Sequence, residues 1–140
     1  MHAFHIVLVL FAILSLVGFG FLIRWERRQY MARGLAGSWL AVRLSTIPIA
    51  FATAALVVIP ARSTSGMEGL AVLYLLLFSA APIVWFGSHW LVGRISRPPM
   101  LFADSARVAG SPIVYLITVA MIAHPLQSLA WSLLRSLGVD

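Results

Sequence analysis

The chain has 140 residues, of which 61% are hydrophobic and only 10% are charged. A soluble domain carries about 25% charged residues, because its surface has to be hydrated. The few charged side chains here cannot cover such a surface, so the composition excludes a water-soluble globular domain and indicates an integral membrane protein. Cysteine is absent, which excludes disulfides, thiolate metal ligands and thiol redox chemistry from this sequence.

The net charge is +6, and every basic residue is an arginine. Most arginines lie in short segments between apolar runs, which is the positive-inside pattern of membrane proteins. This placement indicates a topology signal rather than a nucleic-acid surface, so no nucleic-acid partner is expected. The arginines expected beside lipid headgroups, including anionic ones, are Arg24, Arg27, Arg28, Arg33, Arg43, Arg94, Arg97 and Arg107.

The first apolar run covers residues 5–23 and is followed at once by an arginine-rich segment. A secretory signal peptide has its positive charge before the apolar stretch. Here only histidine precedes the run, so the charge distribution predicts a retained membrane helix with its N-terminus outside the cytoplasm.

The second run covers residues 39–60. Arg43 lies near its cytoplasmic end, where a long side chain can reach back to the headgroups. Pro48 lies inside the run and is expected to kink the helix or to leave a carbonyl unpaired. The nearly neutral segment 61–69 is typical of an outside loop.

The third and fourth runs cover residues 69–93 and 108–131. Between them, a basic segment contains Pro98 and Pro99, which end a helix or shape a turn. Both arginine-rich loops then fall on one side of the membrane.

The sequence therefore predicts an all-α integral membrane protein in one domain, residues 1–140, with four transmembrane helices and short loops. An arginine- and alanine-rich chain without lysine or asparagine suggests a GC-rich bacterial genome. The expected location is therefore the bacterial inner membrane, and the arginine distribution places both termini in the periplasm.

The segment after Pro125 is open to two interpretations. Leucines 126, 129, 133 and 137 form one stripe at helical spacing, with serines and Arg135 on much of the remaining surface. Such a pattern is typical of an amphipathic helix in the membrane interface. The alternative is that the same residues complete the fourth span.

The acidic residues are all expected in loops or at the terminus: Glu26, Glu68, Asp104 and Asp140. Ion-coupled transporters usually keep an ionisable carboxylate within the bilayer. No carboxylate is expected there in this chain, which disfavours that class. No metal site and no catalytic residues are predicted.

Histidines are the main candidates for chemistry. Haem held between His89 and His124 is disfavoured, because at 1.5 Å per residue these residues lie about 7 Å and about 24 Å from the same membrane face. His124 with His5 remains the candidate pair for haem b or a quinone, although no cofactor is predicted. His89 is expected as a polar residue at the interface, bonding to water or lipid phosphate.

The leading functional hypothesis is a non-catalytic accessory or structural subunit of a larger membrane complex, with other integral subunits as its partners. It rests on the lack of a recognisable catalytic motif, on short loops and on abundant apolar helix faces. Ala50 and Ala54 form a small-xxx-small pair suited to close helix packing. The alternatives are a redox anchor for haem or quinone, a small oligomeric channel or transporter and, less favoured, a lipid-acting enzyme using His89, Arg94 and Asp104.

Overall fold

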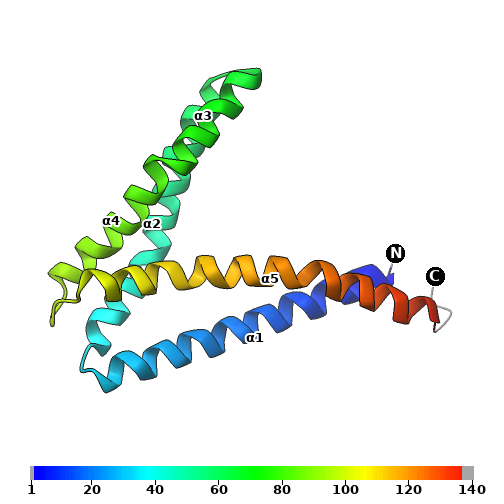
Figure 1. The fold of residues 1–140 in the computed structure, drawn as a ribbon, viewed down its shortest axis with the longest axis horizontal. Helices are drawn as coiled ribbons and strands as arrows, with labels where there is room; N and C mark the ends of the chain where they lie inside the picture. Colours follow the sequence, from blue (N-terminus) through cyan, green and yellow to red (C-terminus); the bar gives the residue numbers. More distant parts are fainter. Residues whose placement is uncertain (1, 137–140) are drawn as a thin grey trace. The chain divides into compact units, whose positions relative to one another are not determined.

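The computed structural model describes residues 2–136, and this part of the chain contains only helices and loops. The helices are α1 (His2–Ala32), α2 (Ala36–Ser63), α3 (Gly66–Phe78), α4 (Ala80–Ile95) and α5 (Phe102–Ser136), as Figure 1 shows. By contacts the chain forms two compact units, each described here by itself. The central unit is Tyr30–Gly110, and the terminal unit comprises residues 2–29 and 111–136. The assignment of one domain stays a prediction.

Four segments are long and apolar enough to cross a membrane: Val7–Ala32, Ala36–Ser63, Gly66–Ile95 and Phe102–Leu133. The prediction of an all-α membrane-type fold with four spans is confirmed. The observed helices run beyond the predicted apolar stretches, because arginine is a good helix former and charge alone does not end a helix. Residues 24–32 therefore belong to α1 rather than to a loop.

A glycine ends α1. Gly34 has a φ of 71°, which residues with a side chain rarely adopt. The N–H of Leu35 donates to the carbonyl of Tyr30, and the N–H of Gly34 donates to that of Met31. These two bonds form a Schellman motif, which satisfies carbonyls at the helix end and reverses the chain toward α2.

The central unit is built on α2, which packs against both α3 and α4. The turn before α3 depends on Gly66, whose φ is 64°, and on Gly69, where an added Cβ would lie 2.7 Å from the carbonyl oxygen of Thr64. The third predicted span is divided at Ser79. Pro82 has no N–H for the carbonyl of Phe78, which explains why α3 ends there and α4 begins anew.

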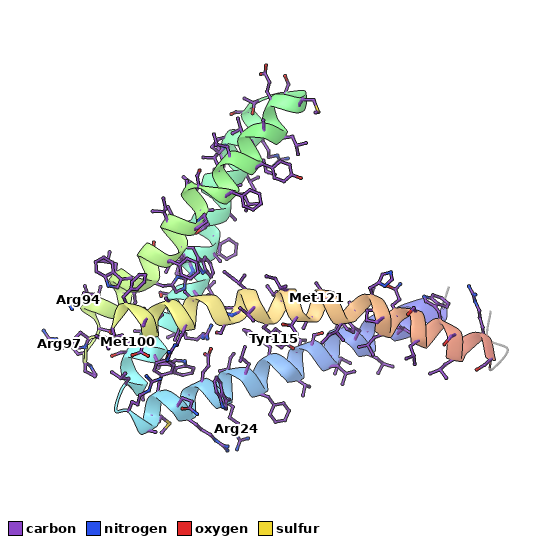
Figure 2. The ribbon with its side chains drawn as sticks, in the orientation of Figure 1. Arg24, Arg94, Arg97, Met100, Tyr115 and Met121 are labelled. Atoms are coloured by element: carbon purple, nitrogen blue, oxygen red, sulfur yellow. The ribbon has the colours of Figure 1, made fainter. Side chains whose placement is uncertain are left out.

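The terminal unit joins α1 to the later part of α5 through Tyr115, labelled in Figure 2. The Tyr115 hydroxyl donates to the carbonyl of Ser15 at 2.5 Å, and its ring lies 5.5 Å from that of Phe19. Gly18 leaves room for this contact, because a Cβ there would lie 2.6 Å from the hydroxyl oxygen. The hydroxyl thus finds a partner in a segment with few polar groups.

The helix α5 continues through Pro125 to Ser136. Residues 126–136 therefore complete one long helix rather than forming a separate interfacial one, and Leu137 lies outside the described residues. Pro48 likewise lies within an uninterrupted α2. A proline removes one backbone hydrogen bond, and the surrounding turns of a long helix keep the remaining bonds.

Candidate functional site

A cluster of buried polar groups in the central unit joins the connection between α1 and α2 to the connection between α4 and α5. The hydroxyl of Tyr30 donates to the backbone carbonyl of Asp104 at 3.1 Å. A guanidinium nitrogen of Arg33 donates to the Asp104 carboxylate at 2.8 Å. The fully buried Ser38 hydroxyl donates to the carbonyl of Pro98. The end of α1 and the start of α2 are thereby fixed to the connection between α4 and α5.

Asp104 differs from its expected place in a loop. It lies in the first turn of α5 and is only 7% exposed. A carboxylate is favourable there, because the N-terminus of a helix carries partial positive charge. Its hydrogen bond, and then its charge, raise the pKa of the Arg33 guanidinium above its ordinary value. The loop assignment was also wrong for Glu26, buried in α1, and for Glu68, in the first turn of α3.

Close packing holds the α4–α5 connection. The N–H of Met100 donates to the carbonyl of Gly93 at 2.9 Å, and the Met100 side chain is 2% exposed. An added Cβ on Gly93 would overlap the hydroxyl of Ser105, so only glycine allows this approach. Ser105 is fully buried, and its hydroxyl has no hydrogen-bond partner among the described residues.

His89 lies inside the central unit and is fully buried. Its Nδ1 lies 2.7 Å from the carbonyl of Trp85, and a carbonyl only accepts, so Nδ1 is assigned as the protonated nitrogen. Its Nε2 faces α2 at 3.2 Å from the Oγ1 of Thr46. The indole of Trp85 packs 4.6 Å from the imidazole and donates to the carbonyl of Ala109 at 3.0 Å.

The expectation that His89 bonds to water or lipid at the interface was therefore wrong. Trp85, His89 and Gly93 recur every four residues and form the face of α4 that turns inward. This spacing was a signal available in the sequence. Sequence reasoning missed Thr46 as the partner, because a hydroxyl in a membrane helix usually bonds its own backbone.

The predicted arginines occupy different settings. Arg43 is half-buried in α2, and Arg33 is exposed but paired with Asp104. The remaining ones are exposed at the side chain: Arg24, Arg27 and Arg28 in α1, Arg94 in α4, Arg97 in the connection after it, and Arg107 in α5.

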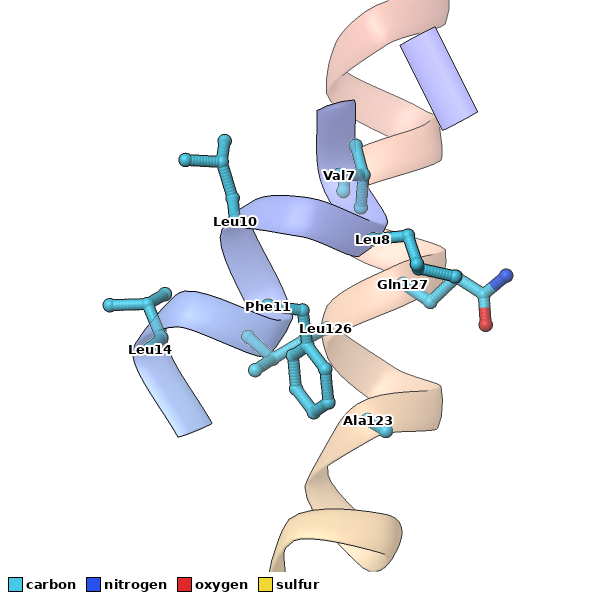
Figure 3. A pocket seen from close by; sticks show the side chains of 9 residues that line it. Val7, Leu8, Leu10, Phe11, Leu14, Ala123, Leu126 and Gln127 are labelled. Carbon is cyan, nitrogen blue, oxygen red and sulfur yellow. The ribbon is translucent and has the colours of Figure 1, made fainter. Parts of the chain in front are cut away.

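The terminal unit contains an apolar groove of about 460 Å³ between α1 and α5 (Figure 3). The side chains that line it are Val7, Leu8, Leu10, Phe11, Leu14, Ala123, Leu126, Gln127 and Ala130. Figure 3 shows the amide of Gln127 pointing away from Leu10 and Leu14. A groove with this lining fits hydrocarbon, and the described lining residues include no histidine.

Of the two candidate cofactor residues, His124 lies beside this groove rather than lining it. His124 follows Ala123 in α5 and is exposed, and the backbone of His5 belongs to α1. Among the residues whose side chains the structure describes, no three His, Cys, Asp or Glu are grouped to hold a metal ion. The haem or quinone hypothesis stays a prediction, which the visible absorbance of the purified protein tests.

Comparison of the chain with models of known protein families, with curated proteins and with solved structures finds no match.

Proposed function

We propose that this protein is a non-catalytic integral subunit that assembles with other membrane-spanning subunits. The observation that carries the proposal is how the polar side chains of the spans are used. Most of their hydroxyls bond a carbonyl one turn back in their own helix, namely those of Ser15, Ser45, Ser79 and Thr118. His89 bonds within the central unit. Side chains whose hydrogen bonds are made within the protein favour a packing role over catalysis or over lining a polar channel.

Small side chains on the outward face of α2 also support the proposed assembly with other subunits. Ala50 and Ala54, the pair suited to close helix packing, are both exposed on α2, so they do not join α2 to α3 or α4. Small side chains favour association in a membrane, because they let two backbones approach and gain van der Waals contact. A helix of another subunit is the partner that this surface fits.

The first experiment is native gel electrophoresis of the tagged full-length protein in mild detergent, with mass spectrometry of the band. The proposal expects a large complex with reproducible membrane partners. Migration as a monomer or small homo-oligomer would contradict it and would favour the channel alternative, which flux into liposomes containing this protein alone then tests.

A matched pair of variants links the complex to the α2 surface. Ala54→Leu places a bulky side chain on the small-residue pair and should reduce recovery of the partners severalfold. Phe51→Leu changes a side chain that is 74% exposed and already large, so the partners should remain. Equal loss in both variants, or in neither, would remove Ala54 from the interface.

A further inference from the structure

Arg94 and Arg97 lie where the third membrane-length segment ends. That segment is Gly66–Ile95, so Arg94 occupies the last turn of α4 and Arg97 lies in the connection just beyond it. Both are exposed, and Figure 2 labels both at this end of the central unit. The phosphate layer of a bilayer begins where the hydrocarbon stops, so the two guanidinium groups are placed at headgroup depth.

Their charge is not neutralised within the central unit. The acidic residues of this unit are Glu68 and Asp104. Asp104 is paired with Arg33, and neither Arg94 nor Arg97 forms an ion pair among the described residues. Glu68 lies in the first turn of α3, roughly 40 Å from Arg94 along the helices at 1.5 Å per residue.

Strongly exposed apolar side chains lie close to these charges along the chain. Ile95 is 71% exposed, Leu101 is 73% exposed and Phe102 is 60% exposed. Nucleic acids and acidic peptides would match the arginines but would leave this apolar surface uncovered. A ligand that is anionic at one end and hydrocarbon at the other matches both features, and a phospholipid has this chemistry.

The backbone that carries Arg97 is held in place. The Ser38 hydroxyl donates to the carbonyl of Pro98, and the N–H of Met100 donates to the carbonyl of Gly93. Binding at an ordered connection loses less conformational entropy than binding at a free loop. A guanidinium also presents paired N–H donors that suit phosphate oxygens.

We propose that Arg94 and Arg97 bind the phosphate of an anionic phospholipid, whose acyl chain lies against Ile95, Leu101 and Phe102. This inference does not depend on the proposed assembly with other subunits, because it concerns the purified protein and lipid alone.

The test is native mass spectrometry of the full-length protein in detergent, titrated with phosphatidylglycerol or phosphatidylcholine of identical acyl chains. The wild-type protein should bind phosphatidylglycerol at least severalfold more tightly. Each arginine near an anionic headgroup contributes about fivefold in affinity, so the pair Arg94→Gln and Arg97→Gln should lose about 30-fold for phosphatidylglycerol. Binding of phosphatidylcholine should change little.

Arg62→Gln is the matched control. Arg62 is also exposed in the last turn of a helix, but it lies about 39 Å along α2 from Ala36, at the far end of the central unit. Arg62 has no second arginine beside it, so its loss should reduce phosphatidylglycerol binding far less than loss of the pair does. If the double variant unfolds, Arg97→Gln alone provides the test, because that residue lies outside the helices.

The proposal would be overturned by undiminished phosphatidylglycerol binding in folded variants lacking these arginines, by equal loss in Arg62→Gln, or by the lack of any preference over phosphatidylcholine. Excess inorganic phosphate should leave the lipid bound, since it lacks the hydrocarbon part. Displacement of the lipid by inorganic phosphate would instead assign the pair to a free anion and would equally overturn it.

Discussion

The Nε2 of His89 and the Oγ1 of Thr46 lie 3.2 Å apart, and this contact joins α4 to α2. Because Nδ1 donates to the carbonyl of Trp85, Nε2 is the acceptor of the neutral ring. The contact is fully buried at the imidazole, so no water replaces it when it is lost.

Thr46→Val should therefore destabilise the protein by about 1 kcal/mol, because it keeps the side-chain shape and leaves Nε2 without a partner. Unfolding in a detergent titration measures this change. Ser45→Ala is the control: Ser45 bonds only the carbonyl of Val42, so its loss should cost less. If both variants unfold alike, the contact between the helices contributes nothing.

Arg33→Gln should destabilise the protein by up to about 1 kcal/mol, the usual range for an ion pair with one solvent-exposed partner. The Arg33 side chain is 43% exposed, whereas the side chain of Asp104 is 10% exposed. Loss of Arg33 therefore leaves a largely buried carboxylate without its ion-pair partner. Arg107→Gln, at an exposed position in α5 with no ion pair among the described residues, should have no effect. Thermal unfolding of both variants under the same conditions gives the comparison.

The pH dependence of the Arg33 contribution follows from the raised pKa of its guanidinium. A group whose pKa is higher in the folded state stabilises the protein fully at a pH below its unfolded-state pKa. This stabilisation is lost as the pH rises through its folded-state pKa. For arginine, both values lie far above neutrality. The stability difference between wild type and Arg33→Gln should therefore stay constant from neutral to moderately alkaline pH. A difference that disappears over that range would contradict an arginine-centred contact.

Gly93→Ala should cost about 1–3 kcal/mol, because its Cβ would overlap the Ser105 hydroxyl in a packed core. Gly87→Ala is matched in α4, where an added Cβ meets nothing within 4 Å. That variant should be neutral or stabilising by up to about 1 kcal/mol, since alanine is the better helix former. Combining Gly93→Ala with Ser105→Ala should recover part of the loss. If the double variant recovers nothing, the overlap with the Ser105 hydroxyl is not the cause of the destabilisation.

Gly18→Ala tests the corresponding contact in the terminal unit. The new Cβ would lie 2.6 Å from the Tyr115 hydroxyl oxygen, whereas at Gly20 a Cβ meets nothing within 4 Å. Gly18→Ala should lower the midpoint of unfolding, and Gly20→Ala should not. Tyr115→Phe removes the oxygen, so the loss caused by Gly18→Ala should be smaller in that background. Equal losses in both backgrounds would exclude the hydroxyl as the cause.

The span count and helical class could be predicted from the sequence, because both depend on local properties. An apolar run long enough to cross a bilayer must form a helix there, since its backbone groups have no other partners. The proline pair at 98–99 correctly marked the connection between α4 and α5. The boundary after residue 23 was misplaced, because charge marks the end of an apolar run and not the end of a helix.

The sequence by itself thus determined that this is a four-span helical membrane protein with two arginine-rich segments between its apolar runs. Only the tertiary structure decided that His89 faces Thr46, that Asp104 pairs with Arg33 and that Ser105 rests on Gly93. Each of these pairs joins residues at least 12 positions apart, on segments whose rotation about the helix axis sets which side chains meet. Hydropathy does not encode that rotation when nearly every side of a helix is apolar, so it becomes visible only once the helices are packed.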